Sequence, residues 1–364
     1  MNFFVDGYWN SNLGDDIFLK TLSERYSEDN FFIYVDERNY RTIKDLKNVH
    51  PIFESGNEFI NKIMYKLGAK FKIVLPGSRE SKIYNYIKKY NNFIEIGGSI
   101  FIQNKNSMDG KYALRNKVSK NKKVNYCIIG SNFGPYYKEY QILNYRNLLK
   151  KVKGISFRDE YSFNIFKDIP AASWYPDIVF GLNVQKYKKS KDFILISVIR
   201  PKDKNIRHNY QKWLIKLIND LTVLKKERVV LMSFCENEGD LSFANNLYYR
   251  INSKGRENVM IYNHTSVEAS LELFAKAKKV VATRFHSMIL SWIFDKPVFV
   301  ISYSDKTDNV INSIAPRQNF VKIDNLNSEV SCSYTNYSEK YFDNAKDEAK
   351  GHFRIIDVLK KEYQ

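Results

Sequence analysis

Apolar and polar residues alternate in blocks along the chain, and these blocks predict strands separated by helices. Short apolar runs predict strands in the first half at residues 2–5, 31–35, 72–75, 93–96, 124–129 and 154–157. A second series of predicted strands lies at residues 193–199, 229–234, 259–262, 279–282 and 298–301. The intervening stretches have helical length and amphipathic patterning, as at residues 211–224 and 241–251. This alternation indicates an α/β protein whose parallel sheets are covered by helices on both faces.

A charged stretch without apolar periodicity, residues 186–191, separates the two series and is typical of a linker. It predicts a first domain over residues 1–185, a second over residues 192–315, and a C-terminal extension over residues 316–364. The extension is charged and helical in pattern over residues 337–363, where it either folds back over the first domain or forms a surface helix. Two such domains imply a central cleft, and residues that directly follow strands are expected to meet a ligand there.

The chain is strongly basic, with 58 Lys and Arg against 40 Asp and Glu among 364 residues, a net charge of +18. This balance favours anionic partners: phosphorylated small molecules, acidic lipid headgroups or nucleic acid. Several short basic runs are either solvated surface or a face that meets an anionic membrane leaflet. These runs lie at residues 117–123, 150–153, 186–191 and 276–279.

Other features bear on location and cofactors. No apolar stretch reaches the length that spans a bilayer, and residues 1–6 lack the basic region of a signal peptide. Cys127, Cys235 and Cys332 form no C-x-x-C pair, and no cluster of His, Asp and Glu predicts a metal site. We therefore expect a cytoplasmic protein without a metal or cofactor, either free or peripheral at the inner face of the cell membrane.

The turn after the first strand leads into a helix and carries Asn12, Asp15 and Asp16. Free N–H groups at a helix N-terminus can bind an anion, but two carboxylates would repel a phosphate. The carboxylates either suit the dipole of the helix that they begin, or one of them recognises a hydroxyl and acts as a general base.

Glycine turns follow two later strands of the first domain. One is Gly97-Gly98-Ser99, and the other covers residues 130–135 and contains Asn132. Glycine lets a backbone approach a ligand closely, although tight turns use the same residue. Neither turn has the glycine spacing of a dinucleotide fold or a P-loop, which disfavours a nicotinamide cofactor and P-loop chemistry.

Cationic residues follow strands in both domains. Arg158 either pairs with a carboxylate such as Asp177 or contacts a ligand, and Arg200 follows the first strand of the second domain. The most specific feature is Arg284-Phe285-His286, which opens an apolar helix. A guanidinium can hold a carboxylate or phosphate with two hydrogen bonds, and an imidazole can act as acid or base near neutral pH.

In this order, the strand-end residues resemble the polysaccharide pyruvyl transferase family over about residues 1–315. The matching segments are Ser11-Asn12-Leu13-Gly14-Asp15, Gly97-Gly98-Ser99, residues 130–135, Phe157-Arg158-Asp159 with Ser162, Pro176-Asp177, Arg284-Phe285-His286, and Tyr303 with Lys306. The chain departs from the family pattern at Ser11, where the family has glycine. It departs again at Gln103 and Asn104, near which the family often carries an acidic residue.

The resemblance implies two Rossmann-like domains facing a central cleft, arranged as in GT-B glycosyltransferases, with the acceptor on the first domain and the donor on the second. It implies phosphoenolpyruvate as donor and a sugar as acceptor. The sugar would belong to an exopolysaccharide or capsule, or to its lipid-linked or nucleotide-linked precursor. The product would be a cyclic pyruvate ketal.

Roles for single residues follow from the resemblance together with their chemistry. We expect His286 to be the general acid, Arg284 and Arg200 to hold the donor's anionic groups, and Asp15 or Asp16 to orient or deprotonate the acceptor. The donor site then comprises Arg200, Arg284, His286, Tyr303 and Lys306, and the acceptor site comprises Asn12, Asp15, Asp16, Gly98, Ser99 and Asn132.

Two other functions fit parts of the pattern. A GT-B glycosyltransferase could use Arg284 and Lys306 to bind the pyrophosphate of a nucleotide sugar. Retaining members usually carry two glutamates eight positions apart, and no such pair lies between Glu227 and Glu272. A non-catalytic membrane- or nucleic-acid-binding protein would use the basic charge, but the basic runs are scattered and lack an aromatic–basic strand or zinc spacing, which disfavours nucleic acid.

Overall fold

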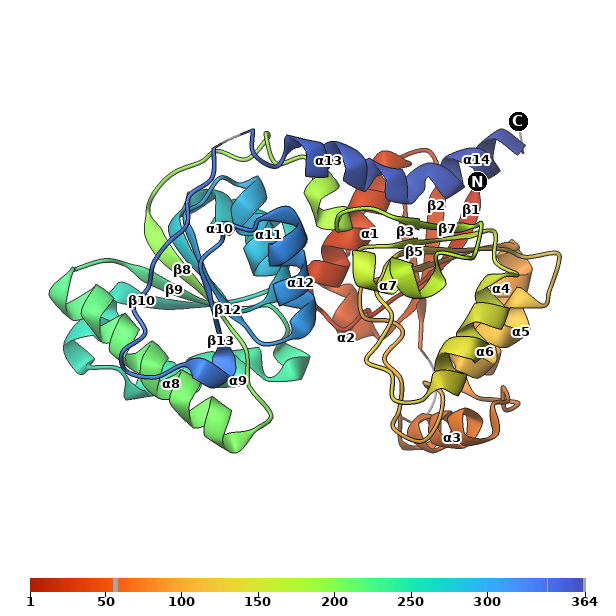
Figure 1. Cartoon of the computed structure of the whole chain (residues 1–364), viewed down its shortest axis with the longest axis horizontal. Coiled ribbons are helices and arrows are strands. Elements are labelled where there is room, and N and C mark those ends of the chain that lie inside the picture. Colours follow the sequence, from red (N-terminus) through yellow and green to blue (C-terminus); the bar gives the residue numbers. More distant parts are fainter. Residues whose placement is uncertain (55–57, 339, 363–364) are drawn as a thin grey trace.

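The computed structural model describes residues 1–54, 58–338 and 340–362, and its core consists of two parallel sheets (Figure 1). The first sheet has the order β3-β2-β1-β4-β5-β6-β7. Its strands are β1 (Asn2–Asp6), β2 (Asn30–Val35), β3 (Val49–Phe53), β4 (Asn92–Ile96), β5 (Asn125–Ser131), β6 (Gly154–Phe157) and β7 (Ala172–Trp174). The second sheet has the order β10-β9-β8-β11-β12-β13. Its strands are β8 (Phe193–Val198), β9 (Val229–Ser233), β10 (Val259–Asn263), β11 (Ala277–Ala282), β12 (Val298–Ser302) and β13 (Phe320–Lys322).

Helices cover both sheets, as the alternating pattern predicts. On the first domain they are α1 (Leu13–Arg25), α2 (Glu37–Tyr40), α3 (Glu58–Phe71), α4 (Arg79–Tyr90), α5 (Tyr112–Ser119), α6 (Glu139–Leu149) and α7 (Glu160–Phe166). On the second they are α8 (Lys204–Asn219), α9 (Asp240–Arg250), α10 (Val267–Lys276), α11 (Phe285–Ile293) and α12 (Asp305–Ile314). The predicted α/β class with two Rossmann-like, GT-B-like domains is confirmed.

The central strands were predictable because they are buried on both faces. Every residue of β4 and of β8 is buried, and their sequences are mostly apolar, with Asn92, Glu95 and Ser197 as the polar exceptions. The edge strands β3, β7 and β13 are largely half-buried and carry mixed residues, and the apolar pattern missed them. The prediction of a strand at residues 72–75 is wrong, because this segment is irregular chain after α3. The strand at this edge of the first sheet is β3.

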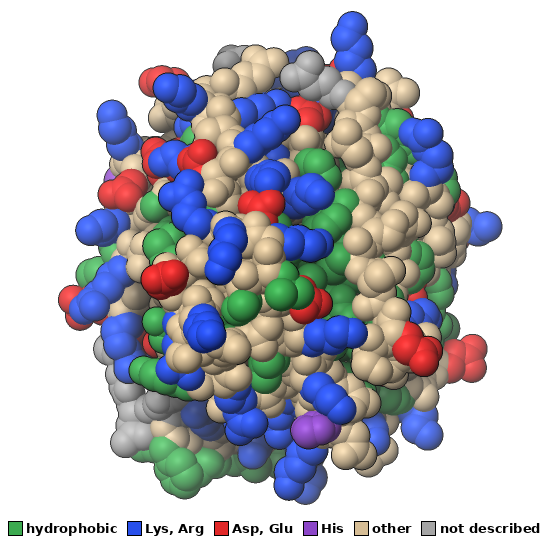
Figure 2. Space-filling view, turned by 90° about the vertical axis from the view of Figure 1, so that its left-hand side faces the viewer, with side chains coloured by type: hydrophobic (Ala, Val, Ile, Leu, Met, Phe, Trp, Pro, Cys, Tyr) green, Lys and Arg blue, Asp and Glu red, His purple; other side chains and the backbone are tan. Residues whose placement is uncertain are grey.

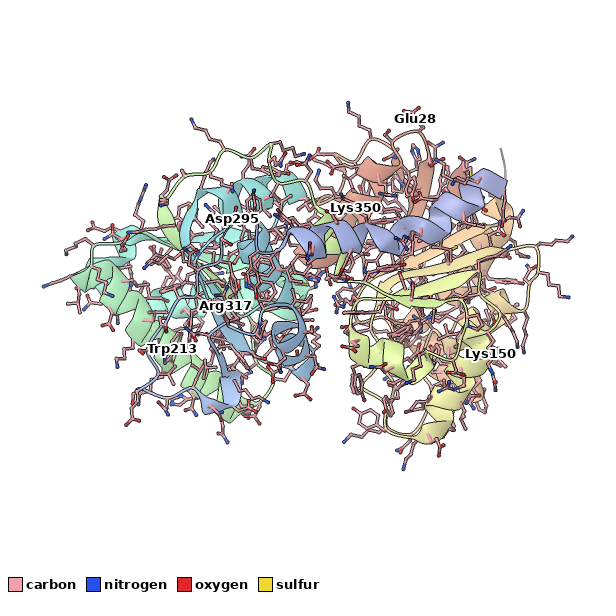
Figure 3. The ribbon with its side chains drawn as sticks, turned by 45° about the horizontal axis from the view of Figure 1, so that its top comes forward. Glu28, Lys150, Trp213, Asp295, Arg317 and Lys350 are labelled. Carbon is pink, nitrogen blue, oxygen red and sulfur yellow. The ribbon has the colours of Figure 1, made fainter. Side chains whose placement is uncertain are left out.

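The chain beyond β13 returns from the second domain to the first. It forms α13 (Asp343–Ala349), a 3₁₀ turn η6 (Lys350–Phe353) and α14 (Arg354–Glu362), and these lie across the junction of the domains (Figure 3). The Tyr26 hydroxyl donates to Asp357 at 2.6 Å, and Phe353 and Ile356 are buried against the first domain. Of the two alternatives for the charged C-terminal segment, the structure therefore shows that it folds back.

The domains also contact each other directly. The Leu13 amide donates to the Phe234 carbonyl at 3.1 Å, which ties the start of α1 to the turn after β9. In the predicted linker, Tyr187 is buried and its hydroxyl donates to Glu268 at 2.6 Å. These contacts fix the carboxyl ends of the two sheets opposite each other. Among the described helices, none is long and apolar enough to cross a bilayer.

Candidate active site between the domains

A cavity of about 970 Å³ lies between the domains, where the carboxyl ends of the strands meet. It is lined by most of the site residues expected from the sequence: Asn12, Asp15, Gly98, Ser99, Arg200, Arg284, His286, Tyr303 and Lys306. Arg158 and Ile199 also line it, together with Tyr8, Ile100, Ile102, Pro201, Lys202, Arg207, Phe234, Asn237, Glu238 and Phe285. The strand-end rule for parallel sheets therefore located the cavity.

Asp15 lies in the first turn of α1 and faces the cavity. Asn12 caps this helix by accepting the Gly14 amide at 3.1 Å, which fixes the direction of the first turn. Burial raises the pKa of Asp15 to about 7, with a further rise from Asp16, while Arg158 and Lys306 oppose it. At neutral pH this carboxyl is therefore present in both protonation states, which suits a group that gives and takes a proton.

His286 lies in the first turn of α11, and its ring packs against the other domain. Its Nε2 is 3.7 Å from the Asp177 carboxylate and 3.4 Å from Nη1 of Arg158. Burial lowers the pKa of His286, and Asp177 only partly offsets this, while the charges of Arg158 and Lys306 lower it further. Because its pKa lies below 6.5, His286 is mostly a neutral imidazole at pH 7. The carboxylate of Asp177 beside it is ionised, because a hydrogen bond from His286 and the charge of Arg158 counteract burial and hold the pKa of Asp177 below the usual range.

The glycines of two motifs make room for these side chains. A Cβ on Gly14 would lie 1.8 Å from Nδ1 of His286, and a Cβ on Gly98 would lie 2.1 Å from Cζ of Arg158. Both contacts are far below van der Waals separation, so neither position accepts a side chain without moving a residue of the site. The sequence suggested that these glycines admit a ligand, but here they admit the histidine and the arginine.

Arg158 both pairs with Asp177 and faces the cavity, so the two alternatives for this residue hold together. It forms an ion pair with Asp177 at 2.9 Å and donates to Oδ1 of Asn132 at 2.8 Å, and it also lines the cavity. Its guanidinium lies 4.8 Å from the centre of the Phe285 ring, a cation–π contact across the domain boundary. Asn132 does not line the cavity but orients Arg158 and accepts from Ser99 at 3.2 Å.

Arg284, by contrast, is occupied by carboxylates of its own domain. Its Nε and Nη2 donate to buried Asp240, the former at 2.8 Å, and its Nη1 donates to Glu238. Each of its three guanidinium nitrogens therefore already donates a hydrogen bond within the protein. Arg284 lines the cavity with its charge neutralised by these carboxylates. Direct binding of a donor anion by Arg284 stays a prediction.

Three other cations of the cavity differ from Arg284 in their partners. Within the part of the chain that the structure describes, Arg200, Lys202 and Lys306 have no carboxylate at ion-pair distance. Nζ of Lys306 is 3.4 Å from the Ser99 hydroxyl on the opposite domain and 5.5 Å from the Phe285 ring. These cations, all from the second domain, make its wall of the cavity positively charged.

Asp16 points away from the cavity although it adjoins Asp15. Its carboxylate accepts from Thr42 at 2.6 Å and lies 2.8 Å from Nε2 of His264, a buried residue of the second domain. This places Asp16 in the interface between the domains and leaves Asp15 as the carboxylate of this helix that faces the cavity. Among the described residues, no group of three His, Cys, Asp or Glu side chains is placed to hold a metal ion.

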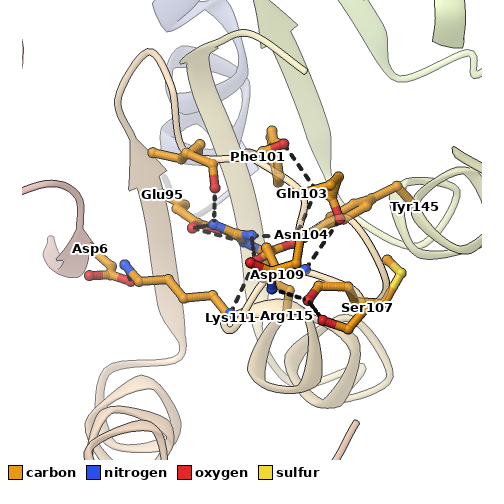
Figure 4. A network of polar contacts seen from close by, with 12 residues as sticks. Asp6, Glu95, Phe101, Gln103, Asn104, Ser107, Asp109, Lys111, Arg115 and Tyr145 are labelled. Carbon is orange, nitrogen blue, oxygen red and sulfur yellow. Dashed lines mark hydrogen bonds and ion pairs between the residues drawn. The ribbon is translucent and has the colours of Figure 1, made fainter. Parts of the chain in front are cut away.

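A buried network (Figure 4) supports the loop of residues 97–111, of which residues 98–100 and 102 line the cavity. Arg115 pairs with Glu95 and Asp109, and its Nη2 donates to the Ile100 carbonyl at 2.9 Å. Gln103 joins the network by donating to Asp109 at 3.2 Å. Gln103, which departs from the family pattern, therefore acts within the scaffold of this wall.

Sequence reasoning left several lining residues unassigned. Tyr8 follows β1, Lys202 follows β8, and Asn237 and Glu238 follow β9, so the strand-end rule applied to every strand would have included them. Arg158 was singled out but not assigned to the site. Ile100 and Ile102 had no chemical signal, because an apolar residue in a turn looks like packing.

Comparisons with known proteins agree with this geometry. A family model described as polysaccharide pyruvyl transferase matches residues 12–305. Amylovoran biosynthesis protein AmsJ of Erwinia amylovora is 25% identical over 261 residues, which are 63% of this chain and 60% of that protein. The chain thus spans about 60% of the length of this curated relative.

Solved structures resemble the chain in fold. Anabaena Alr3699/HepE, solved with UDP and glucose, has a TM-score of 0.54 at 11% identity and covers 100% of this chain and 98% of its own. The UDP-GlcNAc 2-epimerase of Methanocaldococcus jannaschii has a TM-score of 0.58 at 11% identity, with 99% and 100% covered. At such identities the likeness concerns the two-domain GT-B arrangement alone. With the family model spanning residues 12–305, the chain belongs to the polysaccharide pyruvyl transferase family.

Proposed function

We propose that the protein transfers pyruvate from phosphoenolpyruvate to two hydroxyls of a sugar during surface polysaccharide synthesis, forming a cyclic ketal and releasing phosphate. The observation that carries this proposal is the pairing of chemistries in one cavity. Asp15, with a pKa raised to about 7, and His286, with a lowered pKa, face a wall with cations that no carboxylate of the described chain neutralises. Family membership supports the same reaction class.

The donor requires cations because it carries both a carboxylate and a phosphate. Lys306, Arg200 and Lys202 are the groups proposed to hold these anions, since their charges are not spent on nearby carboxylates. Arg284 is assigned a positioning role, because Asp240 and Glu238 already occupy its guanidinium. Arg158 adds positive charge from the first domain, next to His286.

The two proton-transferring groups are assigned from their electrostatics. A bound anionic donor raises the pKa of Asp15 further, so Asp15 is the better acid, and neutral His286 is the better base. This exchanges the roles expected from the sequence. Asp177 then stabilises the imidazolium that forms when His286 accepts a proton, since its carboxylate lies 3.7 Å from Nε2.

The reaction proceeds in balanced steps. Asp15 protonates the methylene carbon of the donor, and the first sugar hydroxyl attacks the adjacent carbon while His286 takes its proton. The C–O bond to phosphate breaks, and His286 returns its proton to the leaving phosphate. The second hydroxyl attacks the same carbon and gives its proton to Asp15, which restores both groups.

Phosphate release from phosphoenolpyruvate tests the proposal. The wild-type chain is incubated with the donor and a panel of nucleotide-linked and lipid-linked sugars, and product is analysed by mass for the gain of a pyruvate ketal. We expect release that depends on one class of sugar. No release with any sugar, together with calorimetric binding of a nucleotide sugar, would instead support the alternative of a GT-B glycosyltransferase.

A further inference from the structure

Helix α3 exposes a row of apolar side chains on the first domain. Ile60, Ile63, Leu67 and Phe71 are 54%, 42%, 43% and 59% exposed. Their spacing follows the helical repeat, so they share one face of the helix. An exposed apolar row of this kind on a folded protein marks a surface that binds something.

The row continues onto neighbouring elements. Ile73 lies two residues beyond the end of α3 and is half exposed, and Tyr140 and Leu143 are exposed on one face of α6. Nζ of Lys72 lies 5.6 Å from the centre of the Tyr140 ring, which places α6 beside the end of α3. We call the side chains of Ile63, Leu67, Phe71, Ile73, Tyr140 and Leu143 the α3 surface.

Basic residues predominate around this surface. Residues 59–73 contain Lys62, Lys66, Lys70 and Lys72 and no Asp or Glu; the nearest acidic residues in sequence, Glu58, Glu80 and Glu139, lie in the first turns of α3, α4 and α6, and Arg79 is paired with Glu54. At the far end of the molecule, by contrast, Lys and Arg side chains are interspersed with Asp and Glu (Figure 2). An apolar helix face flanked by lysines is the pattern that enters the headgroup region of an anionic bilayer, where each basic residue adds to binding.

The α3 surface is linked to the cavity by one loop. Residues 98–100 and Ile102 of the loop that follows β4 line the cavity, and Ile102 is exposed there. Farther along, Gly110 packs so closely on Tyr65 of α3 that an added Cβ would lie 1.7 Å from the ring. In Figure 1, α3 protrudes from the end of the first domain, beyond α5 and α6.

We propose that the α3 surface binds an anionic lipid bilayer, with its apolar side chains among the acyl chains and its lysines at the headgroup phosphates. This locates membrane contact on α3, Ile73 and one face of α6, not on the basic runs that the charge pattern singled out. It has a consequence that rests on the proposed function: the acceptor sugar is carried on a membrane lipid, and the loop between β4 and α5, which packs on α3 and lines the cavity, lies between the bilayer and the reacting groups.

Vesicle flotation of the full chain tests this. Vesicles are made of phosphatidylcholine alone or with about 30% phosphatidylglycerol, and bound protein is measured over a range of salt. Wild type is expected to float with the anionic vesicles and to be released by salt. Two variants, Leu67→Ser/Phe71→Ser and Lys66→Glu/Lys70→Glu, are each expected to lower the partition coefficient by at least about tenfold.

Matched controls lie on the second domain. Leu224→Ser/Tyr249→Ser removes side chains that are 74% and 71% exposed, and Lys212→Glu/Lys254→Glu reverses two exposed charges. Both controls should float like wild type. Absence of wild-type binding to anionic vesicles, or equal losses in the controls, overturns the proposal.

A second measurement distinguishes a protein partner from the bilayer. If light scattering shows a dimer that the α3 variants dissociate, and vesicles bind none of the chains, the α3 surface is a contact between copies and the proposal is wrong. If the serine variant fails to fold by circular dichroism, the charge variant carries the test. Failure here leaves phosphate release with a nucleotide-linked sugar unaffected, so it is distinguishable from failure of the proposed function.

Discussion

The two walls of the cavity differ in how their charges are satisfied. On the first domain, Arg158 is paired with Asp177, and Asp15 keeps a pKa near 7. On the second domain, Arg284 is paired twice, but Arg200 and Lys306 keep their charge toward the cavity. A position at a strand end therefore does not by itself make a cation a binding residue, because a carboxylate partner within the protein can already neutralise its charge.

Replacement of Asp15 gives the largest expected effect. Asp15→Asn removes the proton donor and should lower kcat by about 10²–10⁴-fold. Asp16→Asn is the control, because the neighbouring carboxylate faces His264 and not the cavity. Steady-state phosphate release measures both; equal losses in the two variants would remove the distinction between them.

Replacement of Arg284 shows whether this residue pairs with Asp240 or binds the donor. Arg284→Met leaves the carboxylate of Asp240, which is fully buried, without its partner and should lower the free energy of unfolding by about 3–5 kcal/mol. The double variant Arg284→Met/Asp240→Asn should recover part of this loss, as denaturant unfolding would show. If instead Arg284→Met is as stable as wild type and only raises KM for the donor, Arg284 is a direct ligand.

The proton assignments predict a bell-shaped pH profile. Activity needs Asp15 protonated, so kcat/KM should fall as pH rises above about 7. It also needs His286 neutral, so kcat/KM should fall at acid pH, where His286 becomes protonated with a pKa below its ordinary value of 6.5. The residual activity of Asp15→Asn should lack the alkaline limb; an unchanged limb would assign it to another group.

The smallest expected effect is the change in thermal stability with pH that Asp15 causes. The folded chain holds a proton on Asp15 up to a pH of about 7, whereas an ordinary aspartate releases it near 3.8. Stability from this group is therefore lost as pH rises through that window. Asp15→Asn should match the wild-type Tm at pH 4 and exceed it by roughly 1–3 °C at pH 8, as thermal unfolding would measure.

Burial and the direction of side chains on a helix determined which features could be predicted from the sequence. Strands buried on both faces were readable as apolar runs, and their ends located Asn12, His286 and Lys306. Asp15 and Asp16 are adjacent in sequence, yet successive positions on a helix point about 100° apart, so only the structure shows which one faces the cavity. The partners of Arg284 lie far away in sequence, with Glu238 in the turn after β9 and Asp240 at the start of α9, so the residues around Arg284 give no sign of the pairing.

The most direct test of the account is calorimetric titration with phosphoenolpyruvate, because donor binding by the second-domain wall underlies every later step. Wild type is compared with Lys306→Met and with Lys212→Met, an exposed lysine outside the cavity. We expect one donor to bind per chain, with Kd raised about 10–100-fold in Lys306→Met alone, since a hydrogen bond to a charged group is lost. No binding of phosphoenolpyruvate by wild type, or equal affinity in all three chains, would contradict it.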